Sequence, residues 1–373
     1  MRRKIALVVP GGVDRSGEER VIPVLLALIE RLAARHEVHV FALQQEDTPG
    51  RWTLAGAQIH NAGGQRARER LWRTLRALWQ EHGRGGFDVI HALWSGPQGV
   101  VAVVAATLLR RPSLVHLTGG ELLALPDIGY GGRQHWRGRL REACVLGRAT
   151  RITATSDPML QQLAALGHRA QRVPLGVDQR HWPACPPRPR EAGRPLQLLH
   201  VASLNRVKDP FTLLQALALL AGRGLDFRLA WIGEDTLGGA VQRRAAELGL
   251  QARVTFHGFL TQQALRPHLA QADLLVLSSR HEAGPAVLLE AALSGLPCVG
   301  TAVGHLAEWA PGAAVAVPVG DAQALATGIE RLAADDAERL RLAQAAQRRA
   351  RAEDADHTAS CVLGLYDELA GGR

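Results

Sequence analysis

Two glutamates, Glu282 and Glu290, lie eight positions apart on either side of a turn that leads from a strand into a helix. The segment 273–279 contains an apolar run of strand length that ends in two serines, and Pro285 stands where the first residue of a helix is favoured. Such a helix directs its free N–H groups and the positive end of its dipole toward the edge of a parallel sheet, which creates an anion site. The two carboxylates would then lie on either side of that anion site.

The spacing of these carboxylates suits a ligand with hydroxyl groups at both ends and phosphates between them. From Pro285 to Glu290 the helix rises roughly 7–8 Å, at about 1.5 Å per residue. A nucleotide-sugar has this shape. The alternative is that Glu282 and Glu290 are only solvated, but the helix is otherwise apolar, and a charge in its second turn needs a partner or a wet crevice.

Strand-like and helix-like segments alternate along the chain, which predicts parallel, doubly wound sheets in an α/β protein. At 373 residues the chain is too long for one ordinary core. Prolines crowd into residues 181–195, as is typical of a semi-rigid linker. We therefore expect Rossmann-like domains at 1–180 and 196–345 facing an interdomain cleft, and a helical tail at 346–373 that could pack back on the first domain. The main expected elements are a helix at 18–35 and strands at 4–9, 37–41, 88–91, 113–117, 151–156, 196–201, 227–232, 253–256, 274–278 and 298–300.

Cysteine usage and apolar runs indicate a cytoplasmic protein. The four cysteines are scattered without a C-x-x-C pair, so neither a zinc site nor a disulfide framework is expected. The first apolar run, 5–9, is short for a signal sequence, and the longest, 100–109, is too short to cross a bilayer.

Basic residues are concentrated in the first half of the chain. Residues 1–175 contain 24 Lys and Arg against 14 Asp and Glu, whereas residues 176–373 contain 20 against 21. This excess suggests an anionic partner, and nucleic acid, a membrane surface and a phosphorylated substrate all fit it. A chain with 42 arginines and two lysines could also show the excess for compositional reasons alone.

Two stretches of this basic half combine arginines with tryptophans. In the first, 66–79, we favour packing of the apolar face on its own sheet, with the arginines solvated. In the second, 133–141, contact with an anionic membrane or acceptor and simple solvation explain the pattern equally well. Peripheral contact of the basic domain with the inner face of a membrane is therefore one expected interaction. The apolar residues of the first stretch are Leu71, Trp72, Leu75, Leu78 and Trp79.

The order and spacing of these segments resemble the retaining glycosyltransferases of family 4, which have the two-domain GT-B fold. The most specific match is the block 272–308, and weaker matches run through most of the chain. The resemblance implies an acceptor-side domain at 1–180 and a nucleotide-sugar-binding domain at 196–345. It also implies transfer of a sugar from a nucleoside-diphosphate-sugar to a glycan or lipid-linked acceptor, in the synthesis of cell-envelope polysaccharide or glycolipid.

The same resemblance implies that Glu282 contacts the transferred sugar and that Glu290 holds the nucleotide ribose. Lys208 matches the family's phosphate-binding lysine, and its compact ammonium is not equivalent to the arginine fork that this chain uses elsewhere. Ser203 stands where the family usually has an arginine on the phosphates, and Arg206 is near enough to substitute. The further residues expected around the donor are Ala283, Gly284, Pro285, Ala286, Leu289 and Gly258.

The acceptor is expected at loops that follow the strands of the first domain. Thr118 stands where the family commonly has a histidine, so either transfer relies less on a first-domain side chain than in typical members, or His91 or Glu121 assists it. Gly12 and Gly17 are candidates for the family's glycine-rich loop, although a simple strand-to-helix turn explains either glycine equally well. The candidate residues of these loops are Gly12, Gly17, His91, Thr118, Gly119 and Glu121.

No metal or other cofactor is expected, and the nucleoside-diphosphate-sugar is a substrate. Asp354 and Asp356 match the D-x-D of metal-dependent sugar transferases, but they lie in a helix-patterned tail far from any strand end. No carboxylate is evidently placed as a covalent nucleophile, so retention is expected to use front-face attack.

Three alternatives stay open. A sugar-nucleotide epimerase or phosphorylase could share the architecture, although these enzymes lack the order of residues from Glu282 to Glu308. A catalytically weak relative could bind nucleotide-sugars only. A nucleic-acid-binding protein would explain the charge but would leave Glu282, Glu290 and Lys208 without a role, and no recognised nucleic-acid module appears. We therefore expect no nucleic-acid partner.

Overall fold

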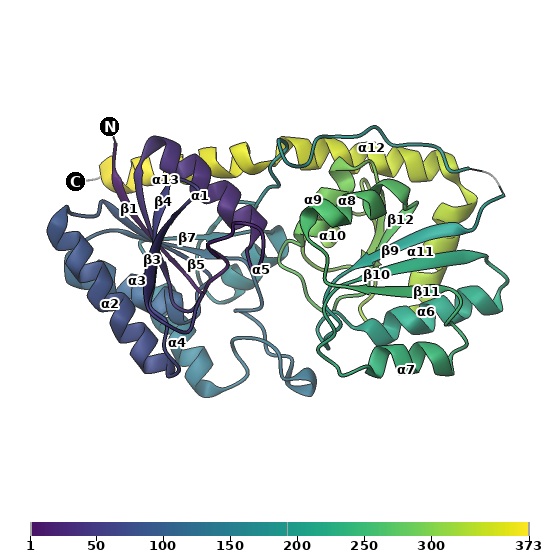
Figure 1. The fold of residues 1–373 in the computed structure, drawn as a ribbon, viewed down its shortest axis with the longest axis horizontal. Helices are drawn as coiled ribbons and strands as arrows, with labels where there is room; N and C mark the ends of the chain where they lie inside the picture. Colours follow the sequence, from purple (N-terminus) through teal and green to yellow (C-terminus); the bar gives the residue numbers. More distant parts are fainter. Residues whose placement is uncertain (1, 192, 372–373) are drawn as a thin grey trace. The chain divides into compact units, whose positions relative to one another are not determined.

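The computed structural model describes residues 2–191 and 193–371 as two α/β units, each built around its own sheet (Figure 1). Unit 1 runs to Asp178 and takes in the segment from Glu353 onward, and unit 2 comprises Gln179–Ala352. We expected the second domain at 196–345, whereas the contacts of the chain group the flanking residues with it as well. Residue 192 of the expected linker and the terminal residues 1, 372 and 373 lie outside the described residues.

Unit 1 contains an eight-stranded sheet in the order β3-β4-β2-β1-β5-β6-β7-β8. Its neighbouring strands are parallel except for β3, which runs antiparallel to β4 at one edge. The side chains of the central strands are mostly apolar and are buried on both faces of the sheet, as is typical of parallel sheets covered by helices. The strands are β1 (Lys4–Val9), β2 (Glu37–Ala42), β3 (Gly50–Leu54), β4 (Ala57–Asn61), β5 (Val89–Leu93), β6 (Ser113–Leu117), β7 (Arg151–Ala154) and β8 (Gln171–Arg172).

Helices cover both faces of this sheet (Figure 1). The last helix contacts α1 and β5, so the end of the chain completes the core of unit 1. α3 contacts β1, β5 and β6 and lies between α2 and α4. The helices of unit 1 are α1 (Pro23–Arg35), α2 (Ala67–Arg84), α3 (Pro97–Leu109), the short 3-10 helix η1 (Pro126–Ile128), α4 (Trp136–Arg148), α5 (Asp157–Ala165) and α13 (Ala355–Gly371).

Two details of these helices differ from the sequence-based expectation. The helix expected at 18–35 begins at Pro23, because proline starts a helix readily and the residues before it form a turn. On α2, Leu78 is buried, but Trp72 and Trp79 are 60% and 59% exposed. The tryptophans fall one position after Leu71 and Leu78, which turns them by about 100° away from the packed stripe.

Unit 2 contains a six-stranded sheet in the order β11-β10-β9-β12-β13-β14, in which each pair of neighbours is parallel. Leucine, valine and tryptophan side chains of the strands form its core with α6 and α11. The strands are β9 (Leu196–Val201), β10 (Phe227–Ile232), β11 (Val254–Gly258), β12 (Leu274–Leu277), β13 (Cys298–Thr301) and β14 (Val315–Val317).

The helices of unit 2 also lie on both faces of the sheet (Figure 1). α6 packs against α7 and α11, whereas α12 packs against α9. The expected tail helix at 346–373 is divided: α12 ends at Ala352 in unit 2, and α13 belongs to unit 1. Among the described residues, no helix is both long and apolar enough to span a membrane. The helices are α6 (Pro210–Gly222), α7 (Ala240–Glu247), α8 (Gln262–Gln271), α9 (Ala286–Leu293), α10 (Gly304–Trp309), α11 (Ala322–Ala334) and α12 (Asp336–Ala352).

Candidate functional site

Lys208 and Glu282 meet at the carboxyl ends of two neighbouring strands of unit 2. Lys208 follows β9 and Glu282 follows β12, and these strands pair directly. The Nζ atom of Lys208 lies 2.6 Å from Oε1 of Glu282, and the Ser279 hydroxyl donates to the same oxygen over 2.6 Å. Both charged side chains are mostly buried yet retain some exposure, at 25% and 10%. The pair can therefore exchange partners with a ligand that enters from solvent.

The backbone on either side of this pair is fixed by close contacts. The Ser278 hydroxyl is 2.9 Å from the carbonyl oxygens of both Lys208 and Asp209. A Cβ atom at Gly304 would lie 2.8 Å from the carbonyl oxygen of Glu282, and the φ of Gly304 is +52°. Only glycine allows this approach without displacing the loop. The position of the Glu282 carboxylate is thus set by tertiary contacts and not by its own loop alone.

Helix α9 begins directly after the Glu282 loop. Pro285 is its N-cap, so the helix starts one residue later than the sequence suggested, at Ala286. Among the described residues, no side chain caps this end. The first turn consequently presents N–H groups and the positive end of the helix dipole. Of the residues expected here, Ala283, Pro285 and Leu289 are buried, and Gly284 and Ala286 are half-buried.

Glu290 lies in the second turn of α9 and is 6% exposed. Its Oε1 atom accepts a hydrogen bond of 3.0 Å from Nε2 of Gln262, a residue of α8 that sequence reasoning had not identified. Burial raises the pKa of Glu290 to about 7, and the bond from Gln262 offsets this only in part. A ligand that donates hydroxyl groups to this carboxylate would favour its ionised form.

The remaining expected donor residues are Ser203 and Arg206, which follow β9, and Gly258, which ends β11. Ser203 is half-buried, and Arg206 is exposed without an ion-pair partner among the described residues. The carbonyl oxygen of Gly258 accepts a hydrogen bond of 2.8 Å from the Gly233 N–H. A Cβ atom at Gly233 would lie only 2.0 Å from the carbonyl oxygen of Ala202, so this contact holds the loop after β9.

A buried histidine that the motifs did not indicate lies below the Lys208 and Glu282 pair. His200 of β9 is fully buried, and its Nδ1 is 2.7 Å from the carbonyl oxygen of Val276. Burial lowers the pKa of His200 to about 4. The hydrogen bond with Val276 opposes this decrease, and the charges of Lys208 and Glu282 act in opposite directions. His200 is therefore neutral at pH 7 and orients β9 against β12.

In unit 1 the two candidate glycines form turns after β1. The φ of Gly12 is +80°, and its N–H donates to Oε1 of Gln45 over 2.7 Å. A Cβ atom at Gly12 would lie 2.6 Å from the side chain of Ile22. Gly17 has a φ of +71° and donates to the carbonyl oxygen of Asp14. The backbone conformation of the strand-to-helix turn favours glycine at both positions. The turn alone therefore explains both glycines, without a ligand.

Glu121 organises the loop after β6. Its carboxylate accepts hydrogen bonds from the backbone N–H groups of Ser95, Thr118 and Gly119, the last at 2.6 Å. Burial raises the pKa of Glu121, and these three bonds oppose the increase. The carboxylate therefore clamps two loops together, which limits its freedom to exchange protons with an acceptor. The Thr118 hydroxyl is buried without a hydrogen-bond partner among the described residues.

Trp94 stands beside this clamp in a strained conformation. Its φ of +70° is unusual for a bulky residue, and such strain is concentrated at functional sites. A Cβ atom at Gly119 would come within 3.3 Å of the Trp94 ring. The sequence signal for Trp94 is an aromatic residue directly after a buried strand.

His91 occupies a core position and not the loop position that we expected. It is 1% exposed, and its Nδ1 lies 2.7 Å from the Tyr366 hydroxyl of α13. Burial holds the pKa of His91 well below its usual range. Because the strand ends two residues later, its side chain lies within the sheet and packs the last helix.

Two family models match the chain, one on each half. The model described as Glycosyltransferase Family 4 matches residues 23–181, and the model described as Glycosyl transferases group 1 matches residues 186–349. The chain therefore belongs to these glycosyltransferase families, and its two parallel-sheet units have the GT-B fold.

Individual relatives agree with this assignment. A 2-deoxystreptamine glucosyltransferase of Streptomyces kanamyceticus is 29% identical over 58% of this chain, and the match spans 58% of that relative's length. The structure of a sucrose-phosphate synthase from Thermosynechococcus elongatus superposes with a TM-score of 0.81 at 21% identity and covers 100% of both chains. The structure of Anabaena HepE in complex with UDP-glucose has a TM-score of 0.74 at 20% identity and covers 98% of this chain and 100% of that one. These likenesses establish the fold.

Proposed function

We propose that the protein transfers a sugar from a nucleoside-diphosphate-sugar to a glycan or lipid-linked acceptor with retention at the anomeric carbon. The observation that carries the proposal is the grouping of Lys208, Glu282 and the uncapped start of α9 at one edge of the unit 2 sheet. Together they supply a cation, a hydroxyl acceptor and a row of N–H donors. A solved relative of similar fold binds UDP-glucose, which has groups complementary to all three.

The chemistry requires stabilisation of the departing diphosphate. As the bond from sugar to phosphate breaks, negative charge grows on the leaving oxygen and positive charge grows on the anomeric carbon. Lys208 and the N–H groups of the first turn of α9 can hold the diphosphate, and Arg206 has the free side chain to join them. Glu282 is then released to accept hydroxyl groups of the sugar, and Glu290 accepts those of the ribose.

Retention is proposed to follow from attack on the face that the diphosphate leaves. The acceptor hydroxyl approaches beside the leaving oxygen, forms the new bond to the anomeric carbon, and gives its proton to the departing phosphate. This route needs no carboxylate nucleophile. The loops that we assign to the acceptor are those of Thr118 and Gly119, held by Glu121 and flanked by Trp94.

We also propose that α4 of unit 1 contacts an anionic membrane, where a lipid-linked acceptor or nascent cell-envelope glycan would be found. Trp136 and Leu140 are 62% and 63% exposed and lie one turn apart. Arg137 and Arg139 on the same half of the helix are exposed as well. Basic residues near such a surface contribute about 1 kcal/mol each. Flotation with phosphatidylglycerol vesicles should be lost in Trp136→Ala/Leu140→Ala and at high salt.

The direct test of transfer uses purified protein, a panel of nucleoside-diphosphate-sugars and a mixed acceptor pool. We expect release of nucleoside diphosphate and a product whose anomeric configuration matches that of the donor. Lys208→Ala and Glu282→Ala should each lower turnover by roughly a hundred- to a thousandfold, the usual effect of losing one such stabilising group. Near-normal turnover in either variant, or an inverted product, would overturn the proposal.

A further inference from the structure

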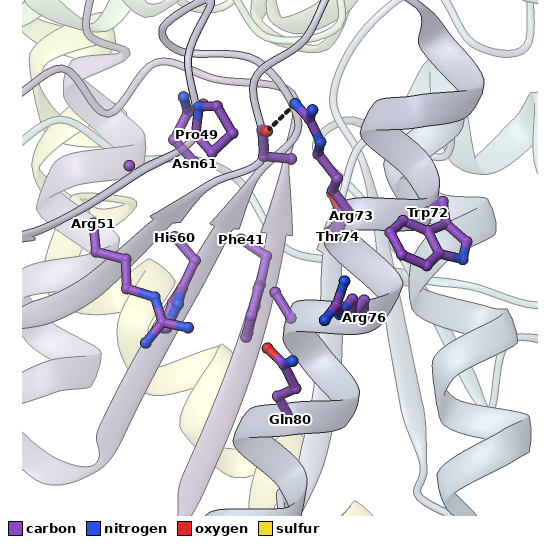
Figure 2. Close-up of a pocket in the computed structure, with 13 residues that line it drawn as sticks. Phe41, Pro49, Arg51, His60, Asn61, Trp72, Arg73, Thr74, Arg76 and Gln80 are labelled. Carbon is purple, nitrogen blue, oxygen red and sulfur yellow. Dashed lines mark hydrogen bonds between the residues drawn. The ribbon is translucent and has the colours of Figure 1, made fainter.

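A cavity of about 440 Å³ lies in unit 1 between the sheet and helix α2 (Figure 2). One wall is a row of cross-strand neighbours: Phe41 of β2 pairs with His60 of β4, which pairs with Arg51 of β3. These three side chains share one face of the sheet, because directly paired residues point the same way. The opposite wall consists of α2 residues, namely Trp72, Arg73, Thr74, Arg76, Ala77 and Gln80.

The lining of this cavity is positively charged. It contains three arginines and no carboxylate. Arg51 and Arg73 each contact a glutamate outside the lining, at 3.3 Å and 2.5 Å. Arg76 has no ion-pair partner among the described residues, and its guanidinium carbon lies 5.4 Å from the centre of the Trp72 ring. At least one uncompensated cation therefore faces the cavity, and it favours an anionic ligand.

Two further features of the lining suit a saccharide. Trp72 is 60% exposed at the rim, and an aromatic face of this kind stacks on the apolar face of a sugar ring. His60 is 7% exposed, and its Nδ1 has no hydrogen-bond partner among the described residues. A buried polar atom left in this state is costly and is satisfied when a ligand or water supplies the partner.

The hydrogen bonds of His60 define which partner it needs. Burial lowers the pKa of His60 to about 4, so the ring is neutral at pH 7. His39 lies between His60 and Glu37: its Nε2 is 2.9 Å from the Glu37 carboxylate, and its Nδ1 is 3.0 Å from Nε2 of His60. In the tautomer in which Nε2 of His39 donates to Glu37, Nδ1 of His39 accepts from Nε2 of His60, which leaves Nδ1 of His60 as an acceptor. A sugar hydroxyl is a suitable donor.

The cavity lies at the edge of the sheet where the acceptor loops begin. β2 and β4 are parallel to β1 and β6, so residues at their carboxyl ends share an edge with Gly12 and Thr118. Adjacent strands are about 4.8 Å apart, and the cavity is therefore a few strand spacings from those loops. An oligosaccharide is long enough to cover this distance.

We propose that this cavity binds an anionic saccharide, with its phosphate or carboxylate on Arg73 and Arg76 and its sugar ring over Trp72. The binding is a property of unit 1 and is independent of transfer. Its use as a remote subsite for the acceptor is a second step, which rests on the proposed function.

Helix α4 carries an arginine beside a tryptophan, as α2 does, and provides the control for a binding experiment. There Arg137 lies 5.4 Å from the centre of the Trp136 ring, the same distance as that between Arg76 and the Trp72 ring, but both residues lie outside the cavity. The full chain is titrated calorimetrically with glucose 6-phosphate and glucuronate, and with glucose as the neutral probe. We expect Arg76→Gln and Trp72→Ala to weaken binding of the acidic sugars at least tenfold, and Arg73→Gln/Arg76→Gln to abolish it.

Arg137→Gln and Trp136→Ala should leave these titrations unchanged, as should Lys208→Ala, which alters the candidate donor site of unit 2. Because Arg76 and Trp72 are exposed, their substitutions should not change the melting temperature, which excludes a folding defect. Equal binding of glucose and glucose 6-phosphate, an equal loss in the α4 variants, or loss in Lys208→Ala would overturn the proposal.

A vesicle flotation experiment distinguishes a soluble saccharide from a lipid headgroup, because both ligands can present a phosphate. Vesicles of phosphatidylglycerol are floated with Arg76→Gln and Arg137→Gln. We expect flotation to depend on Arg137 and not on Arg76. Flotation lost in Arg76→Gln, with no binding of the acidic sugars by the unaltered protein, would overturn the saccharide assignment.

The acceptor role is tested separately, by the KM for an acidic acceptor against the KM for the donor. Arg76→Gln should raise only the former, by about tenfold. If the acidic sugars bind but both KM values are unchanged, the acceptor role is wrong and the binding site stands. If no transfer occurs at all while the sugars still bind, the proposed function fails and this site does not.

Discussion

Lys208 and Glu282 neutralise each other across 2.6 Å. The contact joins the ends of two adjacent strands and keeps both charges in place before a substrate arrives. We propose that a diphosphate competes with Glu282 for the ammonium of Lys208, so that binding of the donor would exchange one ion pair for another and free the carboxylate. The two residues therefore have separable roles, which substitutions can distinguish.

Lys208→Ala and Glu282→Gln should affect nucleotide binding in different ways. Loss of the cation removes a charge-assisted contact, and we expect Lys208→Ala to weaken nucleoside-diphosphate binding by ~2–3 kcal/mol. Glu282→Gln removes the competing carboxylate, so nucleoside-diphosphate affinity should be unchanged or greater while turnover falls. Calorimetry and a steady-state transfer assay measure the two quantities. Equal weakening of nucleotide binding in both variants would show that Glu282 does not compete for Lys208.

Donor binding should release a proton through Glu290. Burial raises the pKa of Glu290 to about 7, whereas ribose hydroxyls that donate to the carboxylate would stabilise its ionised form. Affinity for the nucleotide should thus fall as the pH drops below 7, and binding near pH 6.5 should release protons. Calorimetry in buffers of different ionisation enthalpy detects this release. Glu290→Gln should abolish the release, and proton release that persists in that variant would assign it to another group.

The same carboxylate should influence the stability of unit 2 without ligand. The folded pKa is above the unfolded one, so the folded unit binds more protons between pH 4.5 and 7. Stability is therefore lost as the pH rises through this window, by ~3 kcal/mol if the whole difference is realised. Glu290→Gln should be more stable than the unaltered protein at pH 8 and similar to it at pH 4.5. Chemical denaturation at the two pH values compares them.

Acid should unfold unit 1 before unit 2. Burial lowers the pKa of His60 to about 4 and of His116 to about 3, and it holds that of His91 well below its usual range. As the pH falls, the unfolded state of unit 1 binds protons at these histidines before the folded state does. The free energy of unfolding of unit 1 therefore decreases as the pH falls from 6.5 toward 4. The raised pKa of Glu121 has the opposite effect and offsets this loss only in part.

In unit 2 the lowered pKa of His200 also reduces the free energy of unfolding as the pH falls. The raised pKa of Glu290 increases it over the same range and offsets this loss. Hydrogen exchange by mass spectrometry at pH 5 resolves the two units. We expect faster exchange in β5 and β6 than in β9 and β12. The reverse order would show that other groups control the acid response.

Glu121 should control acceptor binding and not donor binding. Its carboxylate holds the N–H groups of Ser95, Thr118 and Gly119, and Glu121→Ala leaves all three without that partner. We expect the KM for the acceptor to rise about tenfold or more, with the donor KM unchanged and the melting temperature lowered. Trp94→Ala should have a similar effect on the acceptor. A change in donor KM alone would place this loop elsewhere in the reaction.

The sequence indicated most of the sheets, because parallel strands buried on both faces are continuous apolar runs. Strand 4–9 was predicted with its observed ends, and strand 196–201 likewise. The hairpin at 50–61 was not predicted: its two-residue turn has Gly56 at a φ of +78°, but Ala55 at a φ of +50° stands where Asn, Asp or Gly would have completed a recognisable signal. β14 has three residues, too few to show a pattern.

The candidate site was indicated by residue order, but its supporting contacts were not. The pairing of Lys208 with Glu282 joins positions 74 residues apart, and Gln262 and His200 act through tertiary neighbours that no local pattern encodes. For His91, residue order suggested a place in the acceptor loops, and the structure places it elsewhere. It follows the pattern of a strand end, yet its neighbour Tyr366 comes from the last helix, and only the assembled unit places it in the core.

The most direct test of this account is calorimetric titration of the full chain with UDP, GDP and ADP, beside Lys208→Ala and, as an exposed control, Arg137→Gln. We predict that one nucleoside diphosphate binds the unaltered protein and Arg137→Gln with one-to-one stoichiometry, and that Lys208→Ala weakens it about a hundredfold. Equal affinity in Lys208→Ala, or no binding of any of the three, would contradict the central claim that this edge of unit 2 holds a diphosphate.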